Sequence, residues 1–193
     1  MKEADNEGPS KEAAESTEDK KNDNSTATTV KEATTEKDEA KFVAKSLNNR
    51  YTITVIGDKN SGLTHAEEMY VTKVKKTEIA YINALKNLST MIDKEKDGEI
   101  RSLYLYTIEF FDGKGASVNI KGDTKITFDY TEGFNVKKDD TILPFAGHTV
   151  GSMVRIDAEI DRSETLVRQI SYTLNKEGMT GIAVVGKIKR TRN

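Results

Sequence analysis

One stretch of the chain decides the fold: RSLYLYTIEFF, at residues 101–111. Successive side chains of an extended strand point to opposite faces. Leu103 and Leu105 therefore share one face. The opposite face carries four apolar or aromatic side chains, Tyr104, Tyr106, Ile108 and Phe110. A strand that is apolar on both faces is typical of a sheet interior. We therefore predict a central strand here, covered on both sides.

The residues that follow read almost entirely as strands. Residues 112–115 predict a hairpin turn into a strand at 116–121. Ile126, Phe128 and Tyr130 alternate with polar residues, as in a half-exposed strand. After a loop at 131–150, we predict strands at 152–160, 164–174 and 181–188, the first with Val154, Ile156, Ala158 and Ile160 inward. Short turns between strands favour antiparallel pairing, because parallel crossovers need a dozen or more residues.

Residues 50–57 alternate in the same way, with Tyr51 on one side, and predict a strand that ends in a turn at 57–62. Thr64 and Glu67 have the spacing of a helix capping box. Residues 69–74 fit either a strand or the first turns of a helix.

A helix is predicted over residues 77–96. Apolar residues recur there every three to four positions, and Gly98 is placed to end the helix. These apolar residues are Ile79, Ile82, Leu85, Leu88 and Ile92. The predicted fold class is α+β. One long helix packs on a largely antiparallel sheet of about six to eight strands, which forms a partial barrel or a sandwich.

Residues 1–42 have the composition of a disordered tail or tether before a single domain at 43–193. Eight lysines against twelve acidic residues give the first 45 residues a net charge of −4. Before Phe42 the only branched aliphatic residue is Val30. Such a segment buries too little apolar surface to offset the entropy of ordering it. The alternative is a solvated helix over residues 31–44, since Glu, Lys and Ala favour helices.

The same composition bears on location. A polar tether before a folded domain resembles, in organisation only, the mature region of Gram-positive surface lipoproteins. We therefore expect an extracytoplasmic protein that is membrane-tethered in its native form, with Met1 not necessarily the native start. Cytosolic and virion proteins also carry acidic arms, which leaves a cytoplasmic or virion location as the alternative. The longest aliphatic run, residues 182–185, predicts no transmembrane helix, and no signal peptide opens the chain.

Few catalytic chemistries have support in the sequence. The absence of cysteine excludes thiolate nucleophiles, disulfides and Cys-based metal sites. No nucleophile elbow, P-loop or dinucleotide-binding glycine motif occurs. The histidines are His65 and His148, without metal-binding spacing. We therefore predict no catalytic residues and no cofactor, and keep His148 with Asp139 or Asp140 as the minor enzyme hypothesis.

Two charged segments are weak candidates for ion binding. After the predicted helix, Asp93, Glu95 and Asp97 match the first acidic positions of an EF-hand calcium loop. The twelfth position falls on Tyr104 instead of the bidentate Glu, so we predict no metal site. The basic C-terminal end could contact an anion. Its four basic residues are Lys187, Lys189, Arg190 and Arg192.

Aromatic side chains also gather on neighbouring strands. They could stack on bases, as in OB-folds, but acidic neighbours favour core packing instead. These residues are Tyr104, Tyr106, Phe110, Phe111, Phe128 and Tyr130.

The leading functional hypothesis is a non-enzymatic binding module on a flexible tether. It would recognise a protein or envelope component through sheet edges or through loops 57–66, 131–150 and 175–181. The alternative is a cytosolic or phage-encoded protein that binds nucleic acid or takes part in assembly.

Overall fold

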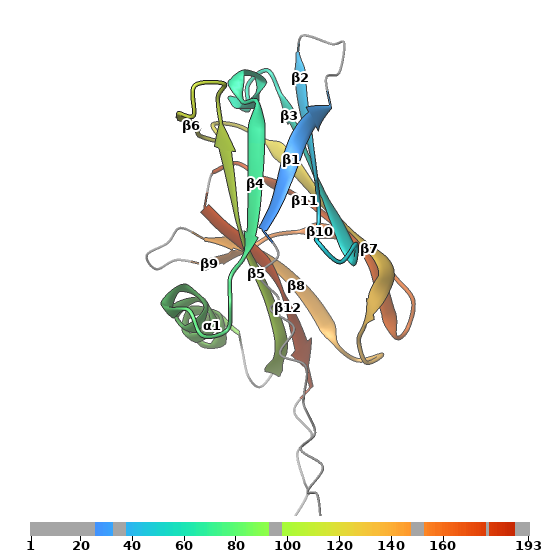
Figure 1. The fold of residues 1–193 in the computed structure, drawn as a ribbon. Coiled ribbons are helices and arrows are strands. Elements are labelled where there is room, and N and C mark those ends of the chain that lie inside the picture. Colours follow the sequence, from blue (N-terminus) through green and yellow to red (C-terminus); the bar gives the residue numbers. More distant parts are fainter. Residues whose placement is uncertain (1–25, 33–37, 93–97, 148–152, 177, 188–193) are drawn as a thin grey trace, which may run out of the picture.

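A computed structural model describes residues 26–32, 38–92, 98–147, 153–176 and 178–187, the first of these ranges by its backbone only. These residues form twelve strands, one α-helix and one 3₁₀ turn (Figure 1). In chain order they are β1 Thr26–Glu32, β2 Glu39–Lys45, β3 Tyr51–Asp58, η1 Leu63–His65, β4 Glu68–Lys73, α1 Ile79–Met91, β5 Glu99–Phe111, β6 Ser117–Val118, β7 Thr124–Asn135, β8 Thr141–Gly147, β9 Met153–Arg155, β10 Ala158–Arg162, β11 Leu166–Leu174 and β12 Gly178–Gly186.

The strands form one continuous antiparallel sheet that folds over into two layers (Figure 1). The order is β10-β11-β7-β3-β2-β1-β4-β5-β12-β8-β9, with β6 paired to β5. Strand β1 joins the layers, because residues 26–30 pair with β4 and residues 31–32 pair with β2. The predicted largely antiparallel sheet is confirmed, and its two layers make a sandwich.

The main core lies between the layers and follows the alternation of their strands. On β3, Ile53 and Val55 are fully buried, and on β7 so are Ile126 and Phe128. A fully buried aliphatic or aromatic side chain contributes about 1.5–3 kcal/mol relative to an exposed one. Alternating apolar side chains therefore hold the two sheets face to face.

Strand β5 is central and covered on both sides, as predicted. Tyr106, Ile108 and Phe110 belong to the core between the layers. Leu103 and Leu105 belong to a second cluster on the outer face of the same sheet. Helix α1 covers that outer cluster, which gives the sheet the layer that the sequence of β5 required.

The prediction of one long helix is wrong. Helix α1 has 13 residues, and Glu78 and Ile92 on either side of it are extended. Its buried residues are Tyr81, Ala84 and Leu88, so the contact face is rotated from the predicted stripe. Ile79 and Ile82 are 76% and 54% exposed, on the outer side of the helix.

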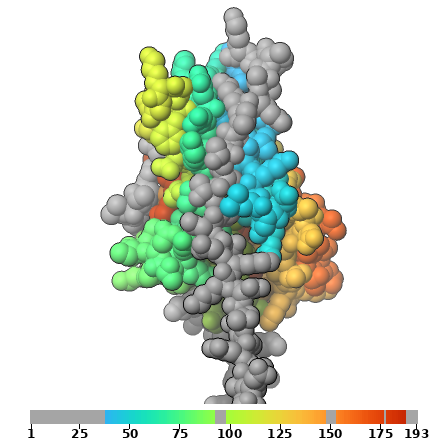
Figure 2. Space-filling model, viewed as in Figure 1, coloured from blue at the N-terminus to red at the C-terminus, as the bar shows by residue number. Residues whose placement is uncertain are grey.

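Helix α1 is short because its end favours other backbone conformations. Ser89 and Thr90 have modest helix propensity, and the Thr90 hydroxyl donates to the Lys86 carbonyl instead of to solvent. Ile92 then turns its buried side chain into the outer cluster. Residues 93–97 lie outside the described residues. In Figure 2, α1 is the green surface at the lower left.

Two strands lie where the sequence analysis placed the tail. Strand β1 falls inside residues 1–42, and so does most of β2. Ala40, Phe42 and Ala44 alternate as buried residues of β2 and join the main core. Alanine is only weakly hydrophobic, so the alternation of buried residues in β2 could not be recognised among its polar and charged neighbours. The helix considered over residues 31–44 is wrong, because the described part of that range forms strands.

Three smaller predictions also differ from the structure. Thr64 lies within a 3₁₀ turn whose N-cap residue is Gly62. No side-chain hydrogen bond caps this turn, so the predicted capping box does not form. The predicted loop at 131–150 contains the end of β7 and all of β8. Pro144 does not interrupt β8, where it pairs with Ile182 of β12. Val154 was expected to point inward but is 61% exposed, because β9 is a short edge strand.

Candidate functional site

Strand β7 carries a bulge of several residues at one end of the sandwich. Asp129 pairs with Gln169 of β11, and the next pair along joins Phe134 to Val167. Residues 130–133 of β7 therefore stand opposite only one residue of β11. Bulges of this kind redirect side chains and are frequent beside functional sites.

Gly133 makes this bulge possible. Its φ angle is 72°, in the left-handed region that favours glycine. A Cβ atom at this position would meet Cγ of Leu166 at 2.7 Å. The sequence therefore supplies a residue without a side chain where the strand leaves its regular path.

The turn between β2 and β3 is fixed against this bulge. The buried Ser46 hydroxyl accepts hydrogen bonds from the backbone N–H groups of Arg50 and Tyr51, at 2.9 and 3.1 Å. The Thr131 hydroxyl donates to the Asn49 carbonyl at 2.7 Å, and the Thr131 N–H donates to the Arg50 carbonyl at 3.0 Å. Turn and bulge thus form one supported unit.

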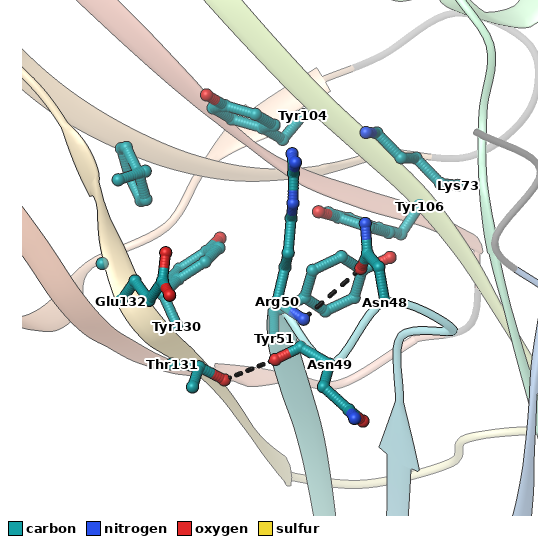
Figure 3. Close-up of a pocket in the computed structure, with 12 residues that line it drawn as sticks. Asn48, Asn49, Arg50, Tyr51, Lys73, Tyr104, Tyr106, Tyr130, Thr131 and Glu132 are labelled. Atoms are coloured by element: carbon teal, nitrogen blue, oxygen red, sulfur yellow. Dashed lines mark hydrogen bonds between the residues drawn. The ribbon is translucent and has the colours of Figure 1, made fainter. Parts of the chain in front are cut away.

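A pocket of about 500 Å³ opens between this unit and the facing sheet (Figure 3). Its lining comes from residues 48–51, from Lys73 at the end of β4, from Tyr104 and Tyr106 of β5, and from residues 130–134 of the bulge. The volume lies within the range of small-molecule sites, roughly 300–1,000 Å³. The geometry therefore suits one small ligand.

Aromatic rings form the walls of the pocket. The ring centroids of Tyr130 and Phe134 are 4.7 Å apart, and those of Tyr104 and Phe134 are 5.4 Å apart. The Tyr51 ring lies 5.7 Å from that of Tyr106 in an edge-to-face arrangement and 6.4 Å from that of Tyr130. Such pairs are favourable and hold one another in place. The walls are therefore firm surfaces on which an apolar ligand body can pack.

The tyrosine hydroxyls give the pocket hydrogen-bonding capacity. The Tyr130 hydroxyl is buried and has no hydrogen-bond partner among the described residues. Burial raises the pKa of Tyr130 and of Tyr106 well above the ordinary value, and neighbouring tyrosines raise both further. Burial also raises the pKa of Tyr104. These phenols therefore stay neutral at physiological pH and can donate hydrogen bonds.

Three charged side chains complete the lining: Arg50, Lys73 and Glu132. Figure 3 shows the Arg50 side chain extending from the turn into the middle of the pocket, toward Tyr104. No hydrogen bond or ion pair of its guanidinium is found within the part of the chain that the structure describes. Counted over the described residues alone, the lining holds two positive side chains and one negative side chain, a formal sum of +1.

Most of the site candidates from the sequence lie elsewhere. Asp93, Glu95 and Asp97 lie outside the described residues, as do Lys189, Arg190 and Arg192. Lys187 is exposed just after β12. His65 is exposed in the 3₁₀ turn. Among the described residues, no group of three or more His, Asp or Glu side chains is placed to hold a metal ion.

The minor enzyme hypothesis gains no geometry from the structure. His148 lies outside the described residues, and Asp139 is exposed. Asp140 is buried, and its Oδ2 accepts the Lys137 N–H at 2.8 Å. Its Oδ1 lies 3.5 Å from Nη1 of Arg101. These contacts brace the turn between β7 and β8.

The aromatic candidates divide between two roles. Tyr106, Phe110 and Phe128 are buried in the main core, as the preferred interpretation predicted. Tyr104 and Tyr130 are only partly buried and line the pocket. Sequence reasoning singled out neither Arg50 nor Tyr51 for the site, whereas Phe134 falls within the predicted recognition loop at 131–150 without having been named. Gly133 within a strand was the signal that could have revealed the bulge.

Comparisons with models of known protein families, with curated proteins and with solved structures find no match for this chain. No α-helix among the described residues is both long and apolar enough to cross a lipid bilayer.

Proposed function

We propose that this protein is a non-enzymatic binding module whose small-molecule ligand occupies the tyrosine-lined pocket. The observation that carries the proposal is the Tyr130 hydroxyl, which is buried at the bulge without a partner in the described part of the chain. An unpaired buried hydroxyl costs about 1–3 kcal/mol. A ligand acceptor in the pocket would offset that cost on binding.

The surroundings of this hydroxyl support the same proposal. The lining combines aromatic walls with a few polar groups, the usual composition of ligand pockets. The Ser46 and Thr131 hydrogen bonds hold the wall in place before a ligand arrives. A preformed site loses less entropy when it binds.

We propose further that the module is tethered outside the cytoplasm. Support comes from the composition of residues 1–25, which hold no aromatic residue and no Leu, Ile or Val. Such a segment suits a flexible spacer between a surface and a folded domain. The intact mass of the protein from its own cells tests this: a lipid adduct supports the tether, and an unmodified chain in the aqueous phase contradicts it.

The nucleic-acid alternative gains no support from the described residues. Three of the six aromatic side chains that could stack on bases are instead buried in the core. Salt-sensitive retention on heparin or single-stranded DNA would revive this alternative, since phosphate binding is strongly salt-dependent.

The pocket can be tested with a neutral fluorescent probe, N-phenyl-1-naphthylamine. We expect one molecule to bind per chain. Tyr104→Ala or Phe134→Ala should weaken binding by about tenfold or more, because each removes part of the wall. Tyr70→Ala is the matched control, since Tyr70 packs on Phe111 outside the pocket. Equal binding by all four proteins would overturn the proposal.

A further inference from the structure

The charges and hydroxyls in the pocket indicate what class of ligand it takes. We infer that the ligand is a small organic anion: a carboxylate, sulfonate or phosphate group attached to a ring or other apolar body. This inference rests on the proposed function of the same pocket and adds the chemistry of its ligand.

Arg50 is the first reason. Its guanidinium extends into the pocket (Figure 3) and makes no hydrogen bond or ion pair that the described residues account for. Guanidinium groups present several N–H donors in a planar fork that matches the oxygens of a carboxylate or phosphate. The Ser46 hydroxyl accepts a hydrogen bond from the Arg50 backbone N–H. This bond fixes the backbone position from which the Arg50 side chain extends.

The tyrosine hydroxyls are the second reason. A neutral phenol can donate one hydrogen bond to an anion. The Tyr130 hydroxyl is buried in the lining and has no acceptor among the described residues. An anion reaching Arg50 from inside the pocket would therefore meet a phenol donor as well as the guanidinium.

An organic cation is the competing ligand class, since aromatic cages bind quaternary ammonium groups. The charge of this pocket argues against a cation. Arg50 extends among the rings and Lys73 lines the same space, whereas Glu132 alone supplies a carboxylate among the described residues of the lining. A cation would therefore meet repulsion where an anion meets attraction.

The rings supply the contact for the rest of the ligand. Tyr104 packs on Phe134, and Tyr51 packs on both Tyr106 and Tyr130. A purely inorganic anion would leave these surfaces unused. The pocket volume of about 500 Å³ leaves room for an apolar body beside the charged group.

The test uses two dyes that share one ring system. 1-Anilinonaphthalene-8-sulfonate carries a sulfonate, and N-phenyl-1-naphthylamine has the same rings without it. We expect the full-length protein to bind the sulfonate dye about tenfold more tightly or better. Arg50→Gln should remove that preference and leave the affinity for the neutral dye unchanged. Arg168→Gln, an equal change of charge on β11 outside the pocket, should leave both affinities unchanged.

Tyr130→Phe is the second variant, because it removes the hydroxyl alone. We expect weaker binding of the sulfonate dye, with no loss of thermal stability, since the hydroxyl has no partner in the described structure. Equal affinity for the two dyes, or displacement of the neutral dye by tetramethylammonium and not by benzoate, would overturn the anion inference and leave the binding module standing. Failure of both dyes to bind would overturn both proposals.

Discussion

A hydrogen-bonded chain inside the core ties the two sheets together, and its removal should destabilise the protein measurably. The Thr180 hydroxyl of β12 donates to the Phe145 carbonyl at 2.9 Å. It lies 2.6 Å from the Tyr172 hydroxyl of β11, so Tyr172 must be the donor of that second bond. All three groups are buried.

Thr180→Val keeps the shape of the side chain and removes both hydrogen bonds. The Tyr172 hydroxyl loses its acceptor and the Phe145 carbonyl loses one donor. Each buried polar group that loses its partner costs about 1–3 kcal/mol, so we expect the free energy of unfolding to fall by about 2–4 kcal/mol. Urea unfolding followed by circular dichroism measures the change through the midpoint at a constant slope.

A double variant shows whether the loss of stability comes from the hydrogen bond between Tyr172 and Thr180. In Tyr172→Phe/Thr180→Val the unpaired phenol is gone as well, so the combined cost should be about 1 kcal/mol or more below the sum of the single variants. Thr127→Val is the control, because Thr127 bonds to Ser171 in a partly buried pair, and should cost less than about 1 kcal/mol. Strict additivity, or a loss below about 0.5 kcal/mol for Thr180→Val, would refute the reasoning.

Three further predictions concern the rest of the sandwich. Burial raises the pKa of three tyrosine hydroxyls, which keeps their neutral form in the folded state. Their contribution to the free energy of unfolding should therefore be constant below about pH 10 and fall above it by up to about 1.4 kcal/mol per pH unit and group, as urea midpoints against pH would show. These tyrosines are Tyr106, Tyr130 and Tyr172. A chain starting at residue 26 should keep its melting temperature, whereas one starting at residue 43 loses β1 and the buried Ala40 and Phe42 and should not fold cooperatively. Gly181→Ala should cost more than about 2 kcal/mol in urea unfolding, because a Cβ would clash with the Tyr104 carbonyl oxygen; an unchanged midpoint would contradict this packing.

The alternation of apolar residues predicted the strands that form the centre of the sandwich. In β5, Leu103 and Tyr106 fall on opposite faces, as expected, because the period of a strand allows no other arrangement. The same reasoning failed for β8, because a proline in the sequence indicates a turn or loop. That Pro144 fits within a strand is evident only from its pairing with β12. The reasoning failed for β2 because Ala40 and Ala44 carry little hydrophobic signal of their own.

The helix shows a different limit of sequence reasoning. Ile79 and Ile82 follow a helical period, but the sheet contacts the neighbouring face through Tyr81 and Ala84. Periodicity identifies a helix, whereas the face that packs is decided by the surface it meets. The length was overestimated because the apolar period continues to Ile92, past Ser89 and Thr90, whose modest helix propensity is only a weak sign of the helix end.

The pocket could be predicted only in fragments. Tyr104 and Tyr130 stood out as aromatic residues on neighbouring strands. Tyr51 joins them through the pairing of β3 with β7, which local sequence does not specify, and Phe134 joins them through the bulge, of which Gly133 is the one local sign. Sites assembled from distant strands need the register of the sheet, and that register depends on the whole core.

The most direct test of the central claim is a backbone amide NMR titration with 1-anilinonaphthalene-8-sulfonate. The account predicts that the largest saturable shift changes fall on residues 48–51, 104–106 and 130–134. Changes that concentrate on helix α1, or that remain absent up to millimolar dye, would contradict a ligand site between the bulge and the facing sheet.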